Sequence, residues 1–178
     1  IFTPLGAEQV AETGKSIFYM IETNPGPGTG VLLAYWPFSK DTITRQSAPG
    51  ALIIHLLGGI HEIYFPYILM NPALLLATIS GSVAALFYNM IFDLGLSGPP
   101  APGSLISYLA MAPKGSTLAV ILSIVIATVV SFLIASPIIK LSNAKSGESL
   151  EEAQQKMQDM KAASKNEATT TTAQVDLK

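Results

Sequence analysis

Residues 117–139 read TLAVILSIVIATVVSFLIASPII, an uncharged stretch that decides the fold class of this chain. A helix needs about 20 apolar residues to cross the hydrocarbon core of a bilayer, and this stretch slightly exceeds that length. Its small and β-branched residues suit close packing between membrane helices. A second uncharged stretch, ALLLATISGSVAALFYNMIF at residues 73–92, also meets the length requirement. The sequence therefore predicts two membrane-spanning helices.

The composition favours the same class. Hydrophobic residues make up 49% of the chain and charged residues 12%, whereas an ordinary soluble domain carries about 25% charged residues. The net charge is only −2 and no basic stripe is present, which excludes nucleic acid as a partner. The absence of cysteine excludes disulfides, thiolate metal sites and a cysteine nucleophile within these residues. We expect no metal and no cofactor.

Two further apolar stretches are interrupted, as membrane segments are where they line a cavity. Residues 51–70 read ALIIHLLGGIHEIYFPYILM, with Gly58 and Gly59 in the middle and Pro66 in the second half. We expect a broken segment there. Residues 98–112 open with a proline-glycine loop and continue with an apolar run too short to span. This pattern predicts a re-entrant or interfacial segment.

The first fifty residues are more polar than the rest of the membrane part. Residues 24–30 read NPGPGTG, which predicts a rigid turn because proline fixes φ and glycine permits positive φ. The run Gly14-Lys15-Ser16 ends like a phosphate-binding loop, but Gln9 stands where such a loop requires glycine. We therefore reject a nucleotide site here.

The C-terminal part of the chain is predicted to lie in the cytoplasm. Lysines cluster after the last span, and the positive-inside rule places such clusters on the cytoplasmic side. A capping-box pattern, SLEE at residues 149–152, opens a short amphipathic helix. We therefore divide the chain into a membrane part at residues 1–142, an amphipathic cytoplasmic helix at 143–164 and a flexible linker at 165–178. The fold class is an all-α membrane protein, a polytopic helical transporter fragment with broken or re-entrant segments.

Glu62 is the first candidate for a functional residue. An ionised carboxylate inside a bilayer costs about 3 kcal/mol or more unless it is paired or solvated, so intramembrane acids are functional by default. Gly58 and Gly59 can break the helix and expose backbone groups, and His61 offers one donor and one acceptor. A carboxylate can accept charge-assisted hydrogen bonds from adjacent hydroxyls. The sequence therefore predicts a buried polar site that surrounds a polyol.

Structural explanations compete with the functional ones. Glu62 could pair with a basic residue elsewhere in the protein, and His61 could be a satisfied packing residue. We interpret His55 as structural because it lies among isoleucines and leucines. Asp93 ends a span, where a solvated acid explains it, and Lys114 fits a loop anchor.

Residues 59–66, GIHEIYFP, closely resemble the GIHE segment of the mannitol-specific enzyme IIC family of the bacterial phosphotransferase system. The resemblance covers residues 1 to about 164. Further stretches resemble the same permease: GKSIF at 14–18, NPGPG at 24–28, GVLLAY at 30–35, PKG at 113–115 and MQDMK at 157–161.

The resemblance implies a multi-pass permease of the bacterial inner membrane that binds mannitol near the membrane midplane. The permease would present mannitol to a phosphorylated cysteine on a IIB domain, with mannitol 1-phosphate as the product. Glu62 would be the principal substrate ligand and could also act as a base toward the attacking hydroxyl. We place His61, Gly59 and Asn24 in the same substrate-binding site.

The resemblance also implies the partners. These are the IIB and IIA domains or proteins, the N-terminal spans of the same permease, a second copy in a homodimer and the lipid bilayer. The chain would be an internal or truncated piece, the C-terminal part of the permease domain, and residues 165–178 would lead toward a IIB domain. Phosphotransferase activity would belong to the complex, because this segment lacks the phosphoryl-carrying cysteine.

Two other functions stay open at this point. A proton- or ion-coupled polyol symporter would use Glu62 and His61 as a proton relay. A non-transporting membrane anchor would use its amphipathic tail to recruit a partner. The residues also do not distinguish mannitol from a related hexitol.

Overall fold

The computed structural model describes residues 2–142 and 152–163, and these two stretches contain helices and no β-strand. This confirms the predicted all-α class. Residues 152–163 form a helix after the membrane part. The elements before it are α1 (Thr3–Thr13), α2 (Ile17–Thr23), α3 (Gly26–Phe38), α4 (Thr42–Gly58), η1 (His61–Tyr64), α5 (Phe65–Met70), η2 (Pro72–Leu74), α6 (Leu75–Ile91), α7 (Leu105–Ala110) and α8 (Thr117–Ser142).

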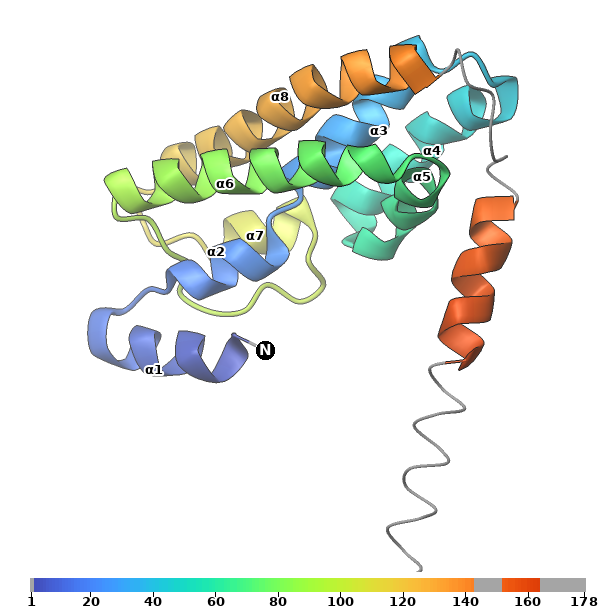
Figure 1. Ribbon diagram of the computed structural model, residues 1–178. Helices are drawn as coiled ribbons and strands as arrows, with labels where there is room; N and C mark the ends of the chain where they lie inside the picture. The colour runs from blue at the N-terminus through green and yellow to red at the C-terminus, as the bar shows by residue number, and fades with distance from the viewer. Residues whose placement is uncertain (1, 143–151, 164–178) are drawn as a thin grey trace, which may run out of the picture.

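The helices Pro72–Ile91 and Thr117–Ser142 are long and apolar enough to cross a membrane. The two predicted apolar stretches therefore do form helices of sufficient length, and Figure 1 shows α6 and α8 side by side. Their outward-facing large side chains are exposed, for example at Leu76, Phe87, Leu118 and Leu133. Such a large apolar surface is rare on a soluble monomer and indicates a face that lipid or further protein covers.

Helix α3 packs against α4, α6 and α8, and it begins at Gly26, inside the predicted turn. The prediction of a turn at residues 26–30 is therefore wrong. Pro27 is tolerated because the first turn of a helix needs no backbone donor there. The Ser131 hydroxyl of α8 donates to the Pro27 carbonyl at 2.8 Å. Packing against α8 thus overrides the local turn signal.

Glycine makes the close approach between α3 and α8 possible. A Cβ atom on Gly30 would lie 2.5 Å from the Thr128 carbonyl oxygen and 2.6 Å from the Ser131 Cβ. A Cβ on Gly81 of α6 would likewise lie 2.7 Å from the Ala127 carbonyl oxygen of α8. Helix α8 therefore meets both neighbours almost backbone to backbone, as the small residues of its sequence suggest.

Asp41 caps the start of α4. Its Oδ2 accepts a hydrogen bond from the Thr44 backbone N–H at 2.9 Å and another from the Thr44 hydroxyl. The bond from the Thr44 hydroxyl, followed by the one from the backbone, holds the pKa of Asp41 below its usual value. The cap therefore depends on the ionised carboxylate.

We expect Asp41→Ala to lower the free energy of unfolding by about 1 kcal/mol, the usual loss for an N-cap, while Asp41→Ser keeps most of it. The folded-state pKa is lowered, so the charge-dependent part is fully present above the unfolded pKa of about 3.9 and is lost as the pH falls through the folded pKa. Thermal unfolding of the detergent-solubilised permease at pH 7 and at acidic pH measures both effects. Equal midpoints for Asp41→Ala and the wild type at pH 7 would refute the capping role.

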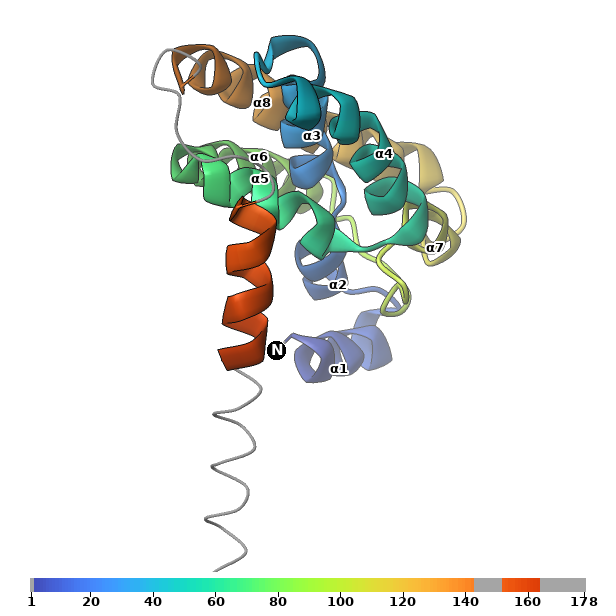
Figure 2. The same cartoon turned by 90° about the vertical axis from the view of Figure 1, so that its right-hand side faces the viewer.

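Residues 152–163 lie beside α5 in Figures 1 and 2. Ala153 is fully buried, whereas Met160, which the predicted amphipathic pattern places on the same apolar face, is exposed. The predicted capping box begins at Ser149, outside the described residues, and so does the predicted linker at residues 165–178.

Candidate functional site

The predicted break in residues 51–70 is confirmed, and it falls at Gly59. Helix α4 ends at Gly58, and Gly59 has a left-handed φ of 69°, which disfavours any residue with a Cβ. A Cβ at Gly59 would also lie only 2.5 Å from the backbone nitrogen of Ser104. The chain therefore turns sharply at Gly59, against the loop that precedes α7.

His61 follows this turn and is held by the same loop. Its Nε2 lies 2.9 Å from the Gly103 carbonyl oxygen, and because a carbonyl can only accept, Nε2 carries the proton. The His61 ring lies 4.7 Å from the His55 ring, measured between centroids. His55 is fully buried, and its Nε2 lies 2.9 Å from the Pro25 carbonyl oxygen. Two histidines thus connect the broken segment to α3 and to the loop.

Glu62 is exposed, so the described part of the chain does not by itself bury the predicted carboxylate. The reason lies in the geometry of η1, a 3₁₀ helix whose successive side chains turn by about 120°. His61 and Tyr64 share the inner side of η1, and both rings pack on His55. Glu62 is therefore turned outward.

The Glu62 side chain faces a shallow pocket next to the C-terminal helix. The pocket has a volume of about 440 Å³ and is lined by Glu62, Phe65, Met157, Met160 and Lys161. Apart from the two charged groups, the lining is apolar. The carboxylate is therefore accessible at the edge of the broken segment and close to residues 152–163.

Asn24 is the fourth predicted site residue, and it lies at the start of α3. Its Oδ1 accepts a hydrogen bond from the Gly26 backbone N–H at 2.9 Å. Gly59, His61 and Glu62 lie together at the break, and Asn24 precedes Pro25, whose carbonyl oxygen is bonded to His55. His55 is fully buried and hydrogen-bonded, which confirms its interpretation as a structural residue. Its contact with the predicted site residue His61 was not predicted from the sequence.

Comparison with known proteins adds to this geometry. The chain is 55% identical over 162 residues to the "PTS system mannitol-specific EIICB component" of Geobacillus stearothermophilus, covering 90% of this chain and 34% of the relative. It is 53% identical over 165 residues to the "PTS system mannitol-specific EIICBA component" of Escherichia coli (strain K12), covering 93% and 26%. The chain belongs to the phosphotransferase-system EIIC family.

A third relative supports the same assignment. The "PTS system mannitol-specific EIICBA component" of Vibrio cholerae is 52% identical over 178 residues, covering 98% of this EIIC chain and 27% of the relative. The chain thus spans about a third or less of the length of these curated relatives. No protein-family model and no solved structure matches it.

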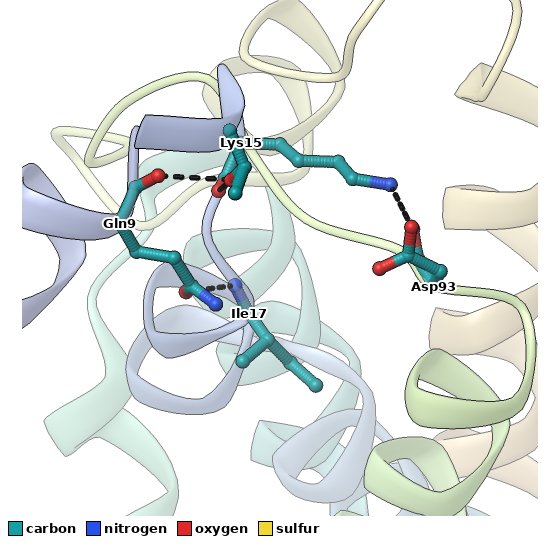
Figure 3. A network of polar contacts seen from close by, with 5 residues as sticks. Gln9, Lys15, Ile17 and Asp93 are labelled. Atoms are coloured by element: carbon teal, nitrogen blue, oxygen red, sulfur yellow. Dashed lines mark hydrogen bonds and ion pairs between the residues drawn. The ribbon is translucent and has the colours of Figure 1, made fainter. Parts of the chain in front are cut away.

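A separate polar cluster of the EIIC chain joins its N-terminal helices to the end of α6 (Figure 3). Lys15 Nζ lies 2.7 Å from Asp93 Oδ2 and also donates to the Asp93 carbonyl. Gln9 Oε1 accepts from the Ile17 backbone N–H at 3.2 Å and from the Ser16 hydroxyl at 2.7 Å. Asp93 is solvated, as predicted, and is also ion-paired. These contacts give Lys15 and Gln9 structural roles and require no ligand.

Proposed function

We propose that this chain is part of a phosphotransferase-system permease that binds mannitol and moves it across the bacterial inner membrane while it is phosphorylated to mannitol 1-phosphate. The observation that carries this proposal is the 52% identity to a mannitol-specific EIICBA component over 98% of the chain. That alignment reaches across almost all of the chain, including the broken segment. Two helices long enough to span a bilayer agree with a membrane component.

Glu62 is the proposed main mannitol ligand. Its carboxylate is exposed at the break, so substrate hydroxyls can reach it. A carboxylate accepts hydrogen bonds from two adjacent hydroxyls, and such charge-assisted bonds are roughly twice as strong as neutral ones. The same oxygen can take the proton of a hydroxyl as that hydroxyl attacks a phosphoryl group. Glu62 is thus both a ligand and a candidate general base.

The other proposed ligands have narrower roles. The Gly103 carbonyl fixes the His61 ring beside Glu62, so a hydroxyl that reaches Glu62 meets an imidazole in a defined orientation. Gly59 contributes backbone at the turn. Asn24 Oδ1 is used by Gly26, which leaves the Asn24 amide N–H groups as the donors for a substrate oxygen.

The proposed partners follow from the site and from the relatives. The names EIICB and EIICBA describe relatives that combine EIIC with further components. We propose that IIB and IIA parts supply the phosphoryl group, since this chain has no cysteine to carry it. Further spans of the permease would close the exposed side of Glu62, and the permease would act as a homodimer.

Uptake by membrane vesicles tests the coupling. We expect vesicles that carry the full-length permease and enclose phosphorylated IIB and IIA to accumulate mannitol 1-phosphate, with no effect of a proton uncoupler. Vesicles without a phosphoryl donor are the control. Accumulation of free mannitol that follows a proton gradient and needs no phosphoryl donor would instead establish a symporter.

The proposed orientation places the C-terminal tail in the cytoplasm, because lysines follow α8 and none lies within its apolar part. A fluorescent reporter fused after Lys165 is expected to be active, and alkaline phosphatase fused there is expected to be inactive. A fusion after Lys114, before α8, is the matched control with the opposite result. Periplasmic activity after Lys165 would overturn this orientation.

A further inference from the structure

His55 is a buried polar residue that the proposed chemistry does not use. Its side chain is fully buried in α4, and its Nε2 must carry the proton because it faces the Pro25 carbonyl oxygen at 2.9 Å. In the neutral ring Nδ1 is then a bare acceptor, and it has no hydrogen-bond partner among the described residues. A buried acceptor without a partner lowers the stability of the fold. An apolar residue would fill this space without that loss.

The neighbours of His55 show which packing contacts its ring makes. Its ring packs on His61 at 4.7 Å and meets the edge of Tyr64 at 5.4 Å, both measured between ring centroids. A Cβ on Gly28 of α3 would lie 2.8 Å from His55 Nε2 and 2.6 Å from Cδ1 of Tyr64. His55 therefore contacts both α3 and η1 at the place where Tyr64 of η1 also packs on α3.

The turn η1 needs such support from outside. It is a four-residue 3₁₀ helix without a side-chain cap at its start, and 3₁₀ hydrogen bonds have poorer geometry than those of an α-helix. Within the described residues, the inner side of η1 makes a polar contact through the hydrogen bond from His61 to the Gly103 carbonyl. The orientation of His61 and Glu62 must therefore come largely from tertiary contacts.

We propose that His55 is a positioning residue for the mannitol site: bonded to Pro25 and packed on His61 and Tyr64, it holds the turn that carries His61 and Glu62 against the start of α3. This inference rests on the proposed function and deepens it. His55 does not touch the substrate, because its ring is enclosed by protein. It acts through His61 and the backbone of η1.

The test uses the full-length permease with three variants. His55→Phe keeps a ring and removes the donor, and His55→Gln keeps a donor and removes the ring. Ile54→Phe places the same new side chain at a neighbouring exposed position of α4 and is the matched control. Hydrogen exchange of the backbone amides at residues 59–65, without substrate, reports the order of the turn. Equilibrium binding of radiolabelled mannitol measures the affinity of the site for mannitol.

We expect His55→Phe to speed exchange at residues 59–65 and to weaken mannitol binding about tenfold, the loss that corresponds to ~1.4 kcal/mol. His55→Gln should give a smaller change of both, and Ile54→Phe should leave both unchanged. If His55→Phe does not accumulate in the membrane, His55→Gln decides the question. Wild-type exchange in the His55 variants would overturn the proposal.

A double-variant cycle separates positioning from general destabilisation. Because His55 acts through His61, His55→Phe should cause little further loss of mannitol affinity in a His61→Ala background. Losses that simply add would overturn the positioning role. If the wild-type permease binds no mannitol while His55→Phe still speeds exchange at the turn, the proposed function fails and the structural role of His55 stands.

Discussion

Glu62→Ala in the full-length permease is expected to abolish detectable mannitol binding. Removing the carboxylate leaves substrate hydroxyls without an acceptor in a site that the complete permease closes. An unmet buried polar group costs about 1 to 3 kcal/mol, and more when the lost partner was charged. At ~1.4 kcal/mol per tenfold, the affinity should fall roughly ten- to several-hundred-fold.

Graded variants at the same position sharpen this expectation. Glu62→Gln keeps an acceptor and loses the charge, and Glu62→Asp keeps the charge but withdraws it by one methylene, so both should retain part of the binding. His61→Ala should have a smaller effect than Glu62→Ala, because water replaces the neutral bonds of an imidazole more easily. Radiolabelled mannitol binding to membrane vesicles, with protein level checked by immunoblot, measures the series. Wild-type affinity in a well-expressed Glu62→Ala permease would remove Glu62 from the site.

Gly30→Ala is expected to prevent stable folding of the permease. The new methyl group would lie 2.5 Å from the Thr128 carbonyl oxygen and 2.8 Å from the Phe132 backbone nitrogen. Both atoms belong to the backbone of α8, which cannot move aside as a flexible side chain can. Overpacking in a well-packed core costs about 1 to 3 kcal/mol, and occasionally more. We expect the high end here, because the whole α3–α8 contact must open.

Gly50→Ala is the matched control. Gly50 lies within α4, and no atom lies within 4 Å of a Cβ built there. Since alanine is the better helix former, the substitution should be neutral or stabilise by up to about 1 kcal/mol. Membrane accumulation and thermal midpoints in detergent compare the two variants. A Gly30→Ala permease as stable as Gly50→Ala would contradict the tight packing of α3 on α8.

Local sequence patterns predicted those parts of the fold that local physics decides. An uncharged run at residues 117–139 is long enough to span a bilayer in any context, and α8 contains it. Paired glycines within residues 51–70 weaken a helix wherever they occur, and α4 does end there. These features needed no knowledge of distant contacts.

Other features depend on tertiary contacts and could not be predicted in this way. The run NPGPGTG has turn-forming residues, yet α3 begins inside it because Gly26 and Gly30 pack closely against α8. The outward direction of Glu62 depends on η1 being a 3₁₀ turn whose inner side is fixed by His55. Lys15 and Asp93 are far apart in the sequence, so their ion pair has no local signature. In each case the feature depends on how the helices pack against one another, which local sequence patterns do not reveal.

Mannitol protection of Glu62 from chemical labelling tests the proposed site most directly. A water-soluble carbodiimide with an amine nucleophile modifies accessible carboxylates, and mass spectrometry of the full-length permease gives the extent of labelling at each one. With saturating mannitol, labelling of Glu62 should fall severalfold, while labelling of Glu12, an exposed residue of α1, should not change. Unchanged labelling of Glu62 in a permease shown to be saturated with mannitol would contradict a substrate site at the broken segment.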